Sequence, residues 1–353
     1  MKHTAYNTKH ISVVVFLLFV SSFAFYISLT LAQFELPGSQ IPSLLDIKPA
    51  LSLSVEPATP MPNFAVSVAA NLTGATNQSN ANYTWFLNGA RQTAASGLNK
   101  NVFTFTAGSL GTIYKIDVAA ATSNGENLTD AVALTVSDID LTWSSNNNVP
   151  AGYRGKILPT QNSTVTVSAL TSVYRPGTKI LINSSGLVYN WRLNDKFLPE
   201  RSGINKSNYA FTADVFSGNK KSVRLEIKTT DGSVLLNKSA EISIVSPETL
   251  IYLPDPDTDK PYGAALKKLI ISQLKSINFA AQNYFFNTPD SNLEWRWLVD
   301  DNEVLGTTQT PWLSVFNIPD NIRLPFFTKI SVLVKNPANE LESSGSNVNL
   351  EIR

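Results

Sequence analysis

The feature that most constrains the fold of this 353-residue chain is a short motif that occurs three times at equal spacing. The three copies are residues 83–89 (YTWFLNG), 189–195 (YNWRLND) and 295–301 (WRWLVDD). Their central tryptophans, Trp85, Trp191 and Trp297, are separated by 106 residues in each case. A fixed period of this kind indicates tandem copies of one structural unit.

Each copy alternates in a way that indicates a β-strand with one buried face. Because successive side chains of a strand point to opposite faces, Tyr83, Trp85 and Leu87 share the inward face. The corresponding positions in the other copies are Tyr189, Trp191 and Leu193, and then Trp295, Trp297 and Val299. We therefore expect the three central tryptophans to be core residues rather than platforms on which a carbohydrate stacks.

Further alternating segments surround each motif. An early one precedes it (residues 66–68, 165–167 and 277–279), and two follow it (114–118 with 132–136, 223–227 with 242–244, and 330–334 with 348–352). The two later segments are separated by turn residues, namely Asn124-Gly125, Asp231-Gly232 and residues 336–339. About seven short strands per copy predict an all-β protein of three tandem Ig-like antiparallel β-sandwich domains.

The N-terminus carries the mark of an exported protein. Lys2 and Lys9 precede an almost unbroken apolar run at residues 11–32. The run exceeds the ~18 residues that favour a membrane-spanning helix, and the positive flank should stay in the cytoplasm. Two alternatives remain open: a signal peptide removed after Ala32, or an uncleaved anchor that holds the protein in the membrane through residues 11–32. Either one places the rest of the chain outside the cytoplasm, at the cell surface or secreted.

The predicted organisation follows from these segments. Residues 1–32 form the signal peptide or anchor helix, 33–50 a proline-containing stalk, 51–137 the first domain, 138–245 the second, 246–261 a joint and 262–353 the third. Residues 264–274 also fit an amphipathic helix. We favour a strand there because the apolar pattern continues into residues 277–279.

The motif also carries a resemblance to known families. The strand at residues 83–89, followed by residues 110–118 (LGTIYKIDV), resembles bacterial immunoglobulin-like and polycystic-kidney-disease-like domains. Residues 280–286 (AAQNYFF) resemble tandem-domain surface proteins of candidate-phyla bacteria. The resemblance covers about residues 48–353 and implies a fold and a surface location rather than an activity. The chain departs from these families in lacking the WDFGDG signature and the immunoglobulin cysteine pair.

Composition excludes several kinds of chemistry. The chain has no cysteine, and its two histidines, His3 and His10, both precede the apolar run. Serine–histidine triads, zinc sites with nitrogen or sulfur ligands and haem ligation are therefore excluded from residues 33–353. We predict no catalytic residue and no cofactor-binding residue, and we interpret the acidic turn at Asp300, Asp301 and Glu303 as a solvated hairpin. Lys and Arg (28) balance Asp and Glu (27) without a basic run, which argues against a nucleic-acid partner.

An alternating acidic segment is one candidate site. Asp255, Asp257 and Asp259 alternate in the joint, and carboxylates spaced in this way can converge on a calcium ion. The segment fails the EF-hand pattern because Lys260 replaces the glycine at its sixth position. We therefore favour an extended linker whose acids face water, with calcium as the alternative.

Aromatic residues beside prolines form the second candidate. Trp312, Phe326 and Phe327 lie in the third domain where strict alternation fails. Exposed aromatics mark contact sites, so these three are candidates for partner contact. The alternative is that they cap the end of the terminal sandwich.

These observations together predict a non-enzymatic, extracytoplasmic structural or adhesive protein. Its Ig-like domains form a rod that presents a binding surface to a protein or glycan at the cell envelope. The alternative function is an accessory subunit of a surface appendage or of a cell-envelope machine.

Overall fold

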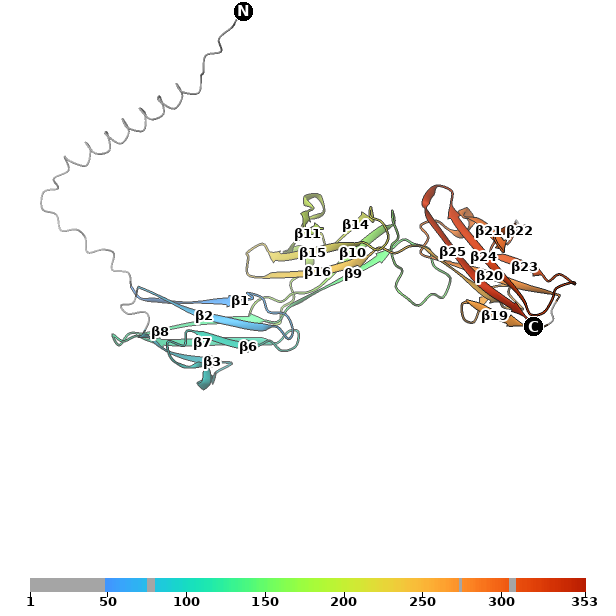
Figure 1. Ribbon diagram of the computed structural model, residues 1–353. Helices are drawn as coiled ribbons and strands as arrows, with labels where there is room; N and C mark the ends of the chain where they lie inside the picture. Colours follow the sequence, from blue (N-terminus) through green and yellow to red (C-terminus); the bar gives the residue numbers. More distant parts are fainter. Residues whose placement is uncertain (1–47, 75–79, 273–274, 305–308) are drawn as a thin grey trace, which may run out of the picture. The chain divides into compact units, whose positions relative to one another are not determined.

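The computed structural model describes residues 48–74, 80–272, 275–304 and 309–353. Figure 1 shows their strands in three successive groups. Within these residues every regular element is a strand or a three-residue 3-10 helix, which confirms the all-β prediction. The predicted N-terminal helix and most of the stalk lie outside the described residues. No helix that is long and apolar enough to cross a membrane is present in the described part of the chain.

The first sandwich consists of two antiparallel sheets. One has the order β1-β2-β6, and its strands are β1 (Ala50–Glu56), β2 (Ala65–Thr73) and β6 (Val102–Thr106). The other has the order β4-β3-β7-β8 with β5 also paired to β3, and its strands are β3 (Asn82–Leu87), β4 (Ala90–Arg91), β5 (Gly97–Leu98), β7 (Ile113–Ala121) and β8 (Asn127–Thr135). Two such sheets around one core are the architecture of an Ig-like sandwich.

The second sandwich repeats this topology strand for strand. Its first sheet, in the order β14-β10-β9, contains β9 (Asp138–Ser145), β10 (Thr164–Ser172) and β14 (Asn208–Thr212). Its second sheet, in the order β12-β11-β15-β16 with β13 paired to β11, contains β11 (Leu187–Leu193), β12 (Lys196–Phe197), β13 (Gly203–Ile204), β15 (Lys220–Thr229) and β16 (Leu235–Ser243).

The third sandwich keeps the plan and adds strands at its edges. One sheet, in the order β18-β17-β20-β23, contains β17 (Glu248–Pro254), β18 (Pro261–Tyr262), β20 (Ser276–Tyr284) and β23 (Leu313–Asn317). The other, in the order β19-β25-β24-β21-β22, contains β19 (Lys268–Ile271), β21 (Glu294–Val299), β22 (Asn302–Val304), β24 (Phe326–Asn336) and β25 (Asn339–Ile352).

Two features of the third sandwich differ from the sequence prediction. The predicted joint at residues 246–261 contains β17, which pairs with β20, so this sandwich begins earlier than residue 262. The ambiguous segment at residues 264–274 contains a strand, β19, as we favoured, but β19 pairs in parallel with β25 in an otherwise antiparallel sheet. The alternation of β17 was not recognised in the sequence because the strand is short and the prolines and acids of residues 254–261 follow it directly.

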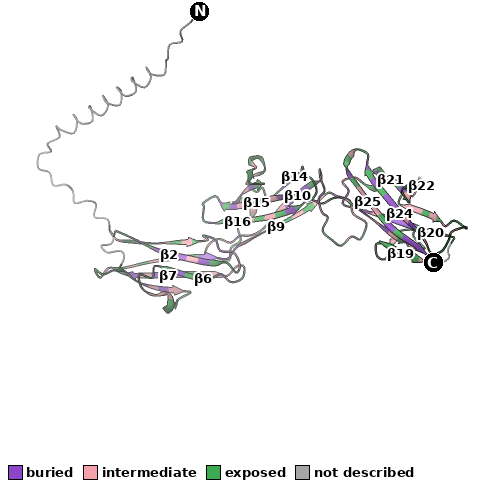
Figure 2. Ribbon diagram, in the orientation of Figure 1, coloured by how far each residue is buried: buried purple, intermediate pink, exposed green. Residues whose placement is uncertain are grey.

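The tryptophan prediction is confirmed in all three sandwiches. Trp85, Trp191 and Trp297 are 0%, 0% and 1% exposed. Buried residues run along the strands of each group, as Figure 2 shows. Each indole N–H also donates to a backbone carbonyl, of Lys100 at 2.9 Å, Lys206 at 2.7 Å and Pro311 at 3.0 Å respectively. The tryptophan therefore fills the core and holds the segment that follows the motif, as expected of a buried indole.

A second device repeats at the turn that ends each motif strand. Asn88, Asn194 and Asp300 have φ angles of 50°, 48° and 44°, a region that Asn and Asp tolerate better than most residues. The side-chain oxygen of each accepts a backbone N–H from the strand that pairs with the motif strand: Lys115 on β7 (2.8 Å), Ser222 on β15 (3.0 Å) and Lys329 on β24 (2.8 Å). The turn is thereby tied to the neighbouring strand in every copy.

Candidate binding groove on the third sandwich

One hollow that involves the third sandwich is a groove of about 710 Å³, called here the Trp312 groove. Half of its lining comes from β17, β20, the β17–β18 hairpin and the residue that precedes β23. The lining residues are Asn148, Val149, Pro150, Ala151, Tyr252, Lys260, Pro261, Gly263, Ala281, Gln282, Asn283, Tyr284, Phe286, Pro289, Asp290 and Trp312.

Two tyrosines form one side of the groove. Tyr252 on β17 and Tyr284 on β20 face each other with their hydroxyl oxygens 2.9 Å apart. Partial burial, and then the hydrogen bond to Tyr284, raise the pKa of Tyr252 above its ordinary value. The Tyr252 phenol therefore stays neutral at physiological pH and offers a hydroxyl group rather than a charge.

A chain of side-chain hydrogen bonds fixes the polar wall of the groove. Thr249 Oγ1 donates to Asn283 Oδ1 at 2.7 Å, and Asn283 Nδ2 donates to Asp290 Oδ1 at 3.0 Å. Asn283 is only 4% exposed, so its amide orientation is set by these two partners. The chain positions the Asp290 carboxylate at the edge of the groove.

Backbone hydrogen bonds, rather than contacts of its own side chain, fix the position of Trp312. The backbone N–H of Ala281 donates to the carbonyl of Trp312 at 2.8 Å, and the core Trp297 holds the carbonyl of Pro311. The Trp312 side chain is nevertheless 36% exposed. Two fixed carbonyls therefore place an indole ring at the groove without burying it in the core.

Residues 148–151, which lie between β9 and β10 of the second sandwich, close another part of the groove. The backbone N–H of Asn148 donates to Phe286 and that of Phe285 to Asn148, both at 2.7 Å. Beside them the buried Asn147 side chain donates to Thr160 Oγ1 at 2.7 Å and to the carbonyl of Phe285 at 2.6 Å. Buried polar groups satisfied in this way hold a single arrangement, which fixes residues 148–151 along the lining.

Several polar groups in the lining have no partner among the described residues. The amide of Gln282, the ammonium of Lys260 and the indole N–H of Trp312 make no hydrogen bond or ion pair with other described residues. Binding pockets place a small number of such groups among apolar and aromatic surfaces. The Trp312 groove therefore has the composition of a ligand site, with aromatic rings beside free donors and acceptors.

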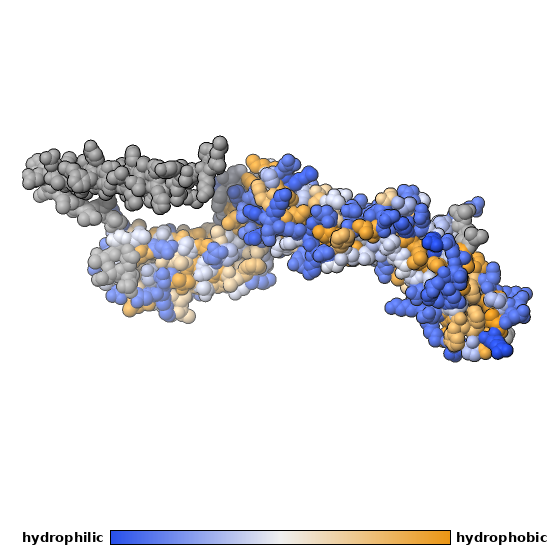
Figure 3. Space-filling view, turned by 45° about the horizontal axis from the view of Figure 1, so that its top comes forward, coloured by the Kyte–Doolittle hydropathy of each residue, from blue (hydrophilic) through white to orange (hydrophobic). Residues whose placement is uncertain are grey.

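The predicted aromatic contact residues do not gather in one place. Trp312 lines the groove, whereas Phe327, 63% exposed, borders a separate hollow of about 390 Å³ on the opposite sheet with Lys268 and Glu351. Phe326 is half-buried and pairs with Ile352 on β25. Figure 3 shows apolar and hydrophilic residues interspersed on the face drawn, so exposed apolar residues occur widely and Phe327 is one of many.

The acidic hairpin is organised by its own backbone. Asp255 Oδ1 accepts the N–H groups of Asp257 and Thr258, each at 3.0 Å, and the hydroxyl of Thr258 at 2.9 Å. The hydroxyl of Thr258, and then these N–H groups, hold the pKa of Asp255 below its usual value. No group of three acids or other ligand residues in the described part of the chain is placed to hold a metal. The calcium prediction for Asp255, Asp257 and Asp259 therefore lacks geometric support.

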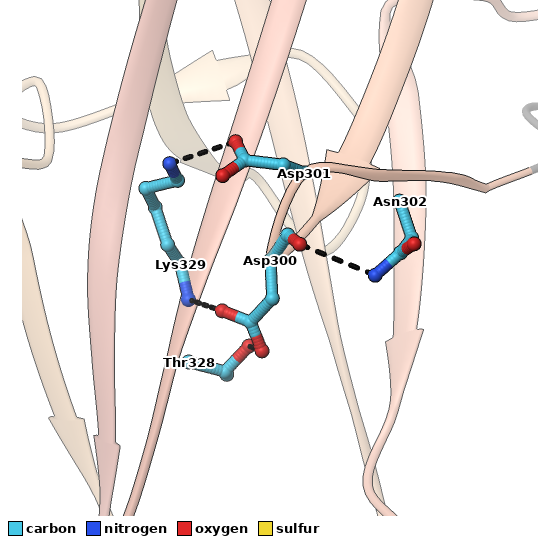
Figure 4. Close-up of polar contacts among 5 residues, drawn as sticks. All are labelled: Asp300, Asp301, Asn302, Thr328 and Lys329. Carbon is cyan, nitrogen blue, oxygen red and sulfur yellow. Dashed lines mark hydrogen bonds and ion pairs between the residues drawn. The ribbon is translucent and has the colours of Figure 1, made fainter.

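The acidic turn of the third motif is also structural, as Figure 4 shows. Asp300 accepts the Thr328 hydroxyl at 2.9 Å and the Lys329 backbone N–H at 2.8 Å. Asp301 pairs with the Lys329 ammonium at 2.8 Å, and Glu303 pairs with Arg296 at 2.6 Å. All three carboxylates are engaged with neighbouring strands, in agreement with the interpretation as a hairpin.

Sequence reasoning identified one residue of the groove and missed the others. Tyr252 lies in the segment that was predicted to be a joint. Gln282 and Tyr284 lie in residues 280–286, which carried a family resemblance and no prediction of a site. A signal existed: Tyr252 and Gln282 occupy outward positions of β17 and β20, where solvent-facing aromatic and amide side chains indicate a contact surface. It becomes readable only once β17 is recognised as a strand.

Comparison with known proteins finds no match by sequence and several similar solved structures. No protein-family model matches the sequence, and no curated protein matches it. Similar solved structures include the three N-terminal domains of the bacteriophage RB49 Highly Immunogenic Outer Capsid protein, which are 10% identical, with 86% of this chain and 99% of that chain covered and a TM-score of 0.26. The central fibronectin-III array of RIM-binding protein is 12% identical, with 86% and 96% covered and a TM-score of 0.28.

A third similar structure, of Sidekick-1 immunoglobulin domains 1–4, is 9% identical, with 86% of this chain and 74% of that chain covered and a TM-score of 0.22. The second of these structures is a fibronectin-III array, and the third consists of immunoglobulin domains. At such TM-scores the assignment of this chain to tandem Ig-like sandwiches rests on its own sheet topology.

Proposed function

We propose that this chain is a non-enzymatic binding protein that works outside the cytoplasm, where its tandem Ig-like sandwiches present a binding surface at the cell envelope. One observation carries the proposal. The side chains that the sequence offered for chemistry, such as Asp255 and Asp300, are engaged in holding turns, whereas Gln282, Lys260 and Trp312 in the groove are unengaged.

The sequence supports the location outside the cytoplasm. Lys2 and Lys9 precede the apolar run at residues 11–32, an order typical of an export signal or anchor. The absence of cysteine is compatible with this location, because each sandwich has its own buried core and needs no disulfide to fold. The fold itself specifies no activity, so the function is argued from the groove.

Protease accessibility on intact cells tests this proposal. A C-terminal epitope tag should be removed by external protease while a cytoplasmic control protein survives. Mass spectrometry of the native N-terminus then separates the two modes of export, since Gln33 as the first residue shows a cleaved signal peptide. A tag that is protected until the cells are lysed, in a host whose surface proteins are digested, contradicts the proposal.

A further inference from the structure

We propose that the Trp312 groove binds a neutral carbohydrate chain, with the Trp312 indole as the surface on which a sugar ring stacks. The inference rests on the proposed binding function and names its class of ligand. It is carried by three properties of the lining: the aromatic rings, the unengaged polar groups and the balance of charge.

The aromatic rings match the faces of a sugar. A pyranose ring presents C–H groups on its faces and hydroxyl groups around its edge, so it packs flat against an aromatic ring. Trp312 offers a large ring that is 36% exposed, and Tyr252 and Tyr284 offer two more in the same groove. Tyr and Trp suit such contacts because each combines an apolar ring with a polar group at one end.

The polar groups match the edge of a sugar. Each hydroxyl of a carbohydrate both donates and accepts hydrogen bonds, and an amide side chain can do the same. The amide of Gln282 and the indole N–H of Trp312 are without partners among the described residues, and the paired phenols of Tyr252 and Tyr284 keep further hydrogen-bonding capacity. These groups come from β17, β20 and the residue before β23, so a ligand along the groove meets them in succession.

The charges of the lining favour a neutral ligand. Lys260 and Asp290 are its two charged residues among those described, and their charges cancel. An acidic polysaccharide or a phosphate would meet the Asp290 carboxylate, and a strongly basic ligand would meet Lys260. Each charged class would also meet the opposite charge, so neither gains a net attraction from the lining, which leaves a neutral ligand at no disadvantage.

The aliphatic content of the lining disfavours a protein partner here. Protein interfaces concentrate their binding energy in large buried side chains that fill pockets on the partner. In the described lining Val149 is the one branched aliphatic residue, and the remaining apolar side chains are proline, alanine and aromatic residues. The lining is suited to a flat, hydroxylated ligand better than to an apolar anchor.

The test is isothermal titration calorimetry of the purified protein with soluble neutral oligosaccharides of glucose, mannose, galactose and N-acetylglucosamine. The first variant is Trp312→Asn, because the first sandwich has Asn101 at the equivalent backbone position. We expect at least one oligosaccharide to bind, and the variant to weaken its binding by about tenfold or more, since it removes the stacking ring. Gln282→Ala should weaken binding by a smaller factor.

Phe327→Asn is the matched control, since it removes an exposed aromatic residue on the opposite sheet. It should bind with the affinity of the parent protein. Thermal unfolding of each variant confirms that the fold is intact. Binding that Trp312→Asn weakens and Phe327→Asn preserves supports the inference.

Three outcomes overturn it: no binding by any of these oligosaccharides, equal binding by the parent and Trp312→Asn, or preferential binding of an acidic polysaccharide included as a comparison. These results are independent of the proposed function, which the accessibility of the C-terminal tag decides. If the protein is exposed at the surface but binds none of the oligosaccharides, the proposed binding function stands and the carbohydrate inference is wrong. A protein confined to the cytoplasm removes the proposed function whatever it binds in the calorimeter.

Discussion

The third sandwich differs from the first two at a position where the backbone is the same. In the first sandwich Ala70 donates its N–H to the carbonyl of Asn101, in the second Ala169 donates to Ser207, and in the third Ala281 donates to Trp312. All three bonds are 2.8 Å long. The same backbone position is therefore fixed in all three sandwiches. Its side chain is short and polar in the first two, Asn101 and Ser207, and is an indole in the third, Trp312.

This difference teaches where such a protein can change without losing its fold. The position lies just after the carbonyl that the core tryptophan holds, so its backbone is fixed by contacts that do not involve its own side chain. The side chain is then free to vary with function. Binding residues commonly sit on connecting segments that a rigid scaffold positions, and Trp312 fits that rule.

The largest expected effect tests whether the three frameworks are equivalent. Trp85→Ala, Trp191→Ala and Trp297→Ala should each destabilise their own sandwich by ~3–5 kcal/mol, as large-to-small changes in a core do. Urea unfolding with hydrogen exchange resolved by region measures the loss. If Trp297→Ala cost far less than the other two, the third core would be built differently and the comparison would fail.

A somewhat smaller effect is expected from the buried amide beside the groove. Asn147→Leu removes the bonds that its amide donates to Thr160, to the Phe285 carbonyl and to Asn287. The Thr160 hydroxyl and the Phe285 carbonyl keep their bond to each other, so the expected cost is about 1–3 kcal/mol, from the buried bonds that are lost. Faster hydrogen exchange at the amides of Asn148 and Phe285 reports the loss. Asn146→Leu changes the exposed neighbouring residue, removes a bond from the Thr164 N–H and leaves the bonds to Thr160 and Phe285 in place, so it serves as the control and should leave those amides protected.

The turn residues are expected to contribute about 1 kcal/mol each, the size of one hydrogen bond and a favourable positive φ. Asn88→Ala and Asn194→Ala each lose one bond to a backbone N–H. Asp300→Ala should cost more than either, because Asp300 also accepts the Thr328 hydroxyl. Chemical denaturation ranks the three variants, and equal losses would show that the second bond of Asp300 adds nothing.

The smallest effect at neutral pH is expected where the first two sandwiches differ in one oxygen atom. Tyr209 packs on Trp191 at 4.9 Å between ring centroids, as Phe103 packs on Trp85 at 5.8 Å. The Tyr209 hydroxyl is buried and has no hydrogen-bond partner among the described residues. Tyr209→Phe should therefore be neutral or slightly stabilising at pH 7, since it removes an unsatisfied polar group.

The same substitution has a larger consequence in alkali. Burial raises the pKa of Tyr209 from 10.0 to about 12. Between these values the unfolded chain releases a proton that the folded chain retains, so the stability of the parent protein falls as the pH rises through that range. Thermal unfolding should show Tyr209→Phe gaining on the parent above pH 10 and not below it. An unchanged difference across the range would place the hydroxyl in contact with water.

Much of the fold was readable from local patterns. The equal spacing of Trp85, Trp191 and Trp297 gave the repeat, and alternation around each gave the core strand. The turn residues were readable because a positive φ restricts the choice of residue. The start of the third sandwich was not, since β17 is short, ends in prolines and acids, and becomes recognisable as a strand only through its pairing with β20.

The sequence by itself determined that the chain is a series of β-sandwiches with tryptophan cores, because strand alternation and residue spacing are local properties that a fixed period repeats. Only the tertiary structure decided which exposed residues share a surface. Tyr252, Tyr284 and Trp312 are far apart in the chain and meet because β17 and β23 both pair with β20, whereas Trp312 and Phe327, which are closer in sequence, lie on opposite sheets. Strand pairing is a long-range choice made by burial of the whole core, and no short stretch of sequence contains it.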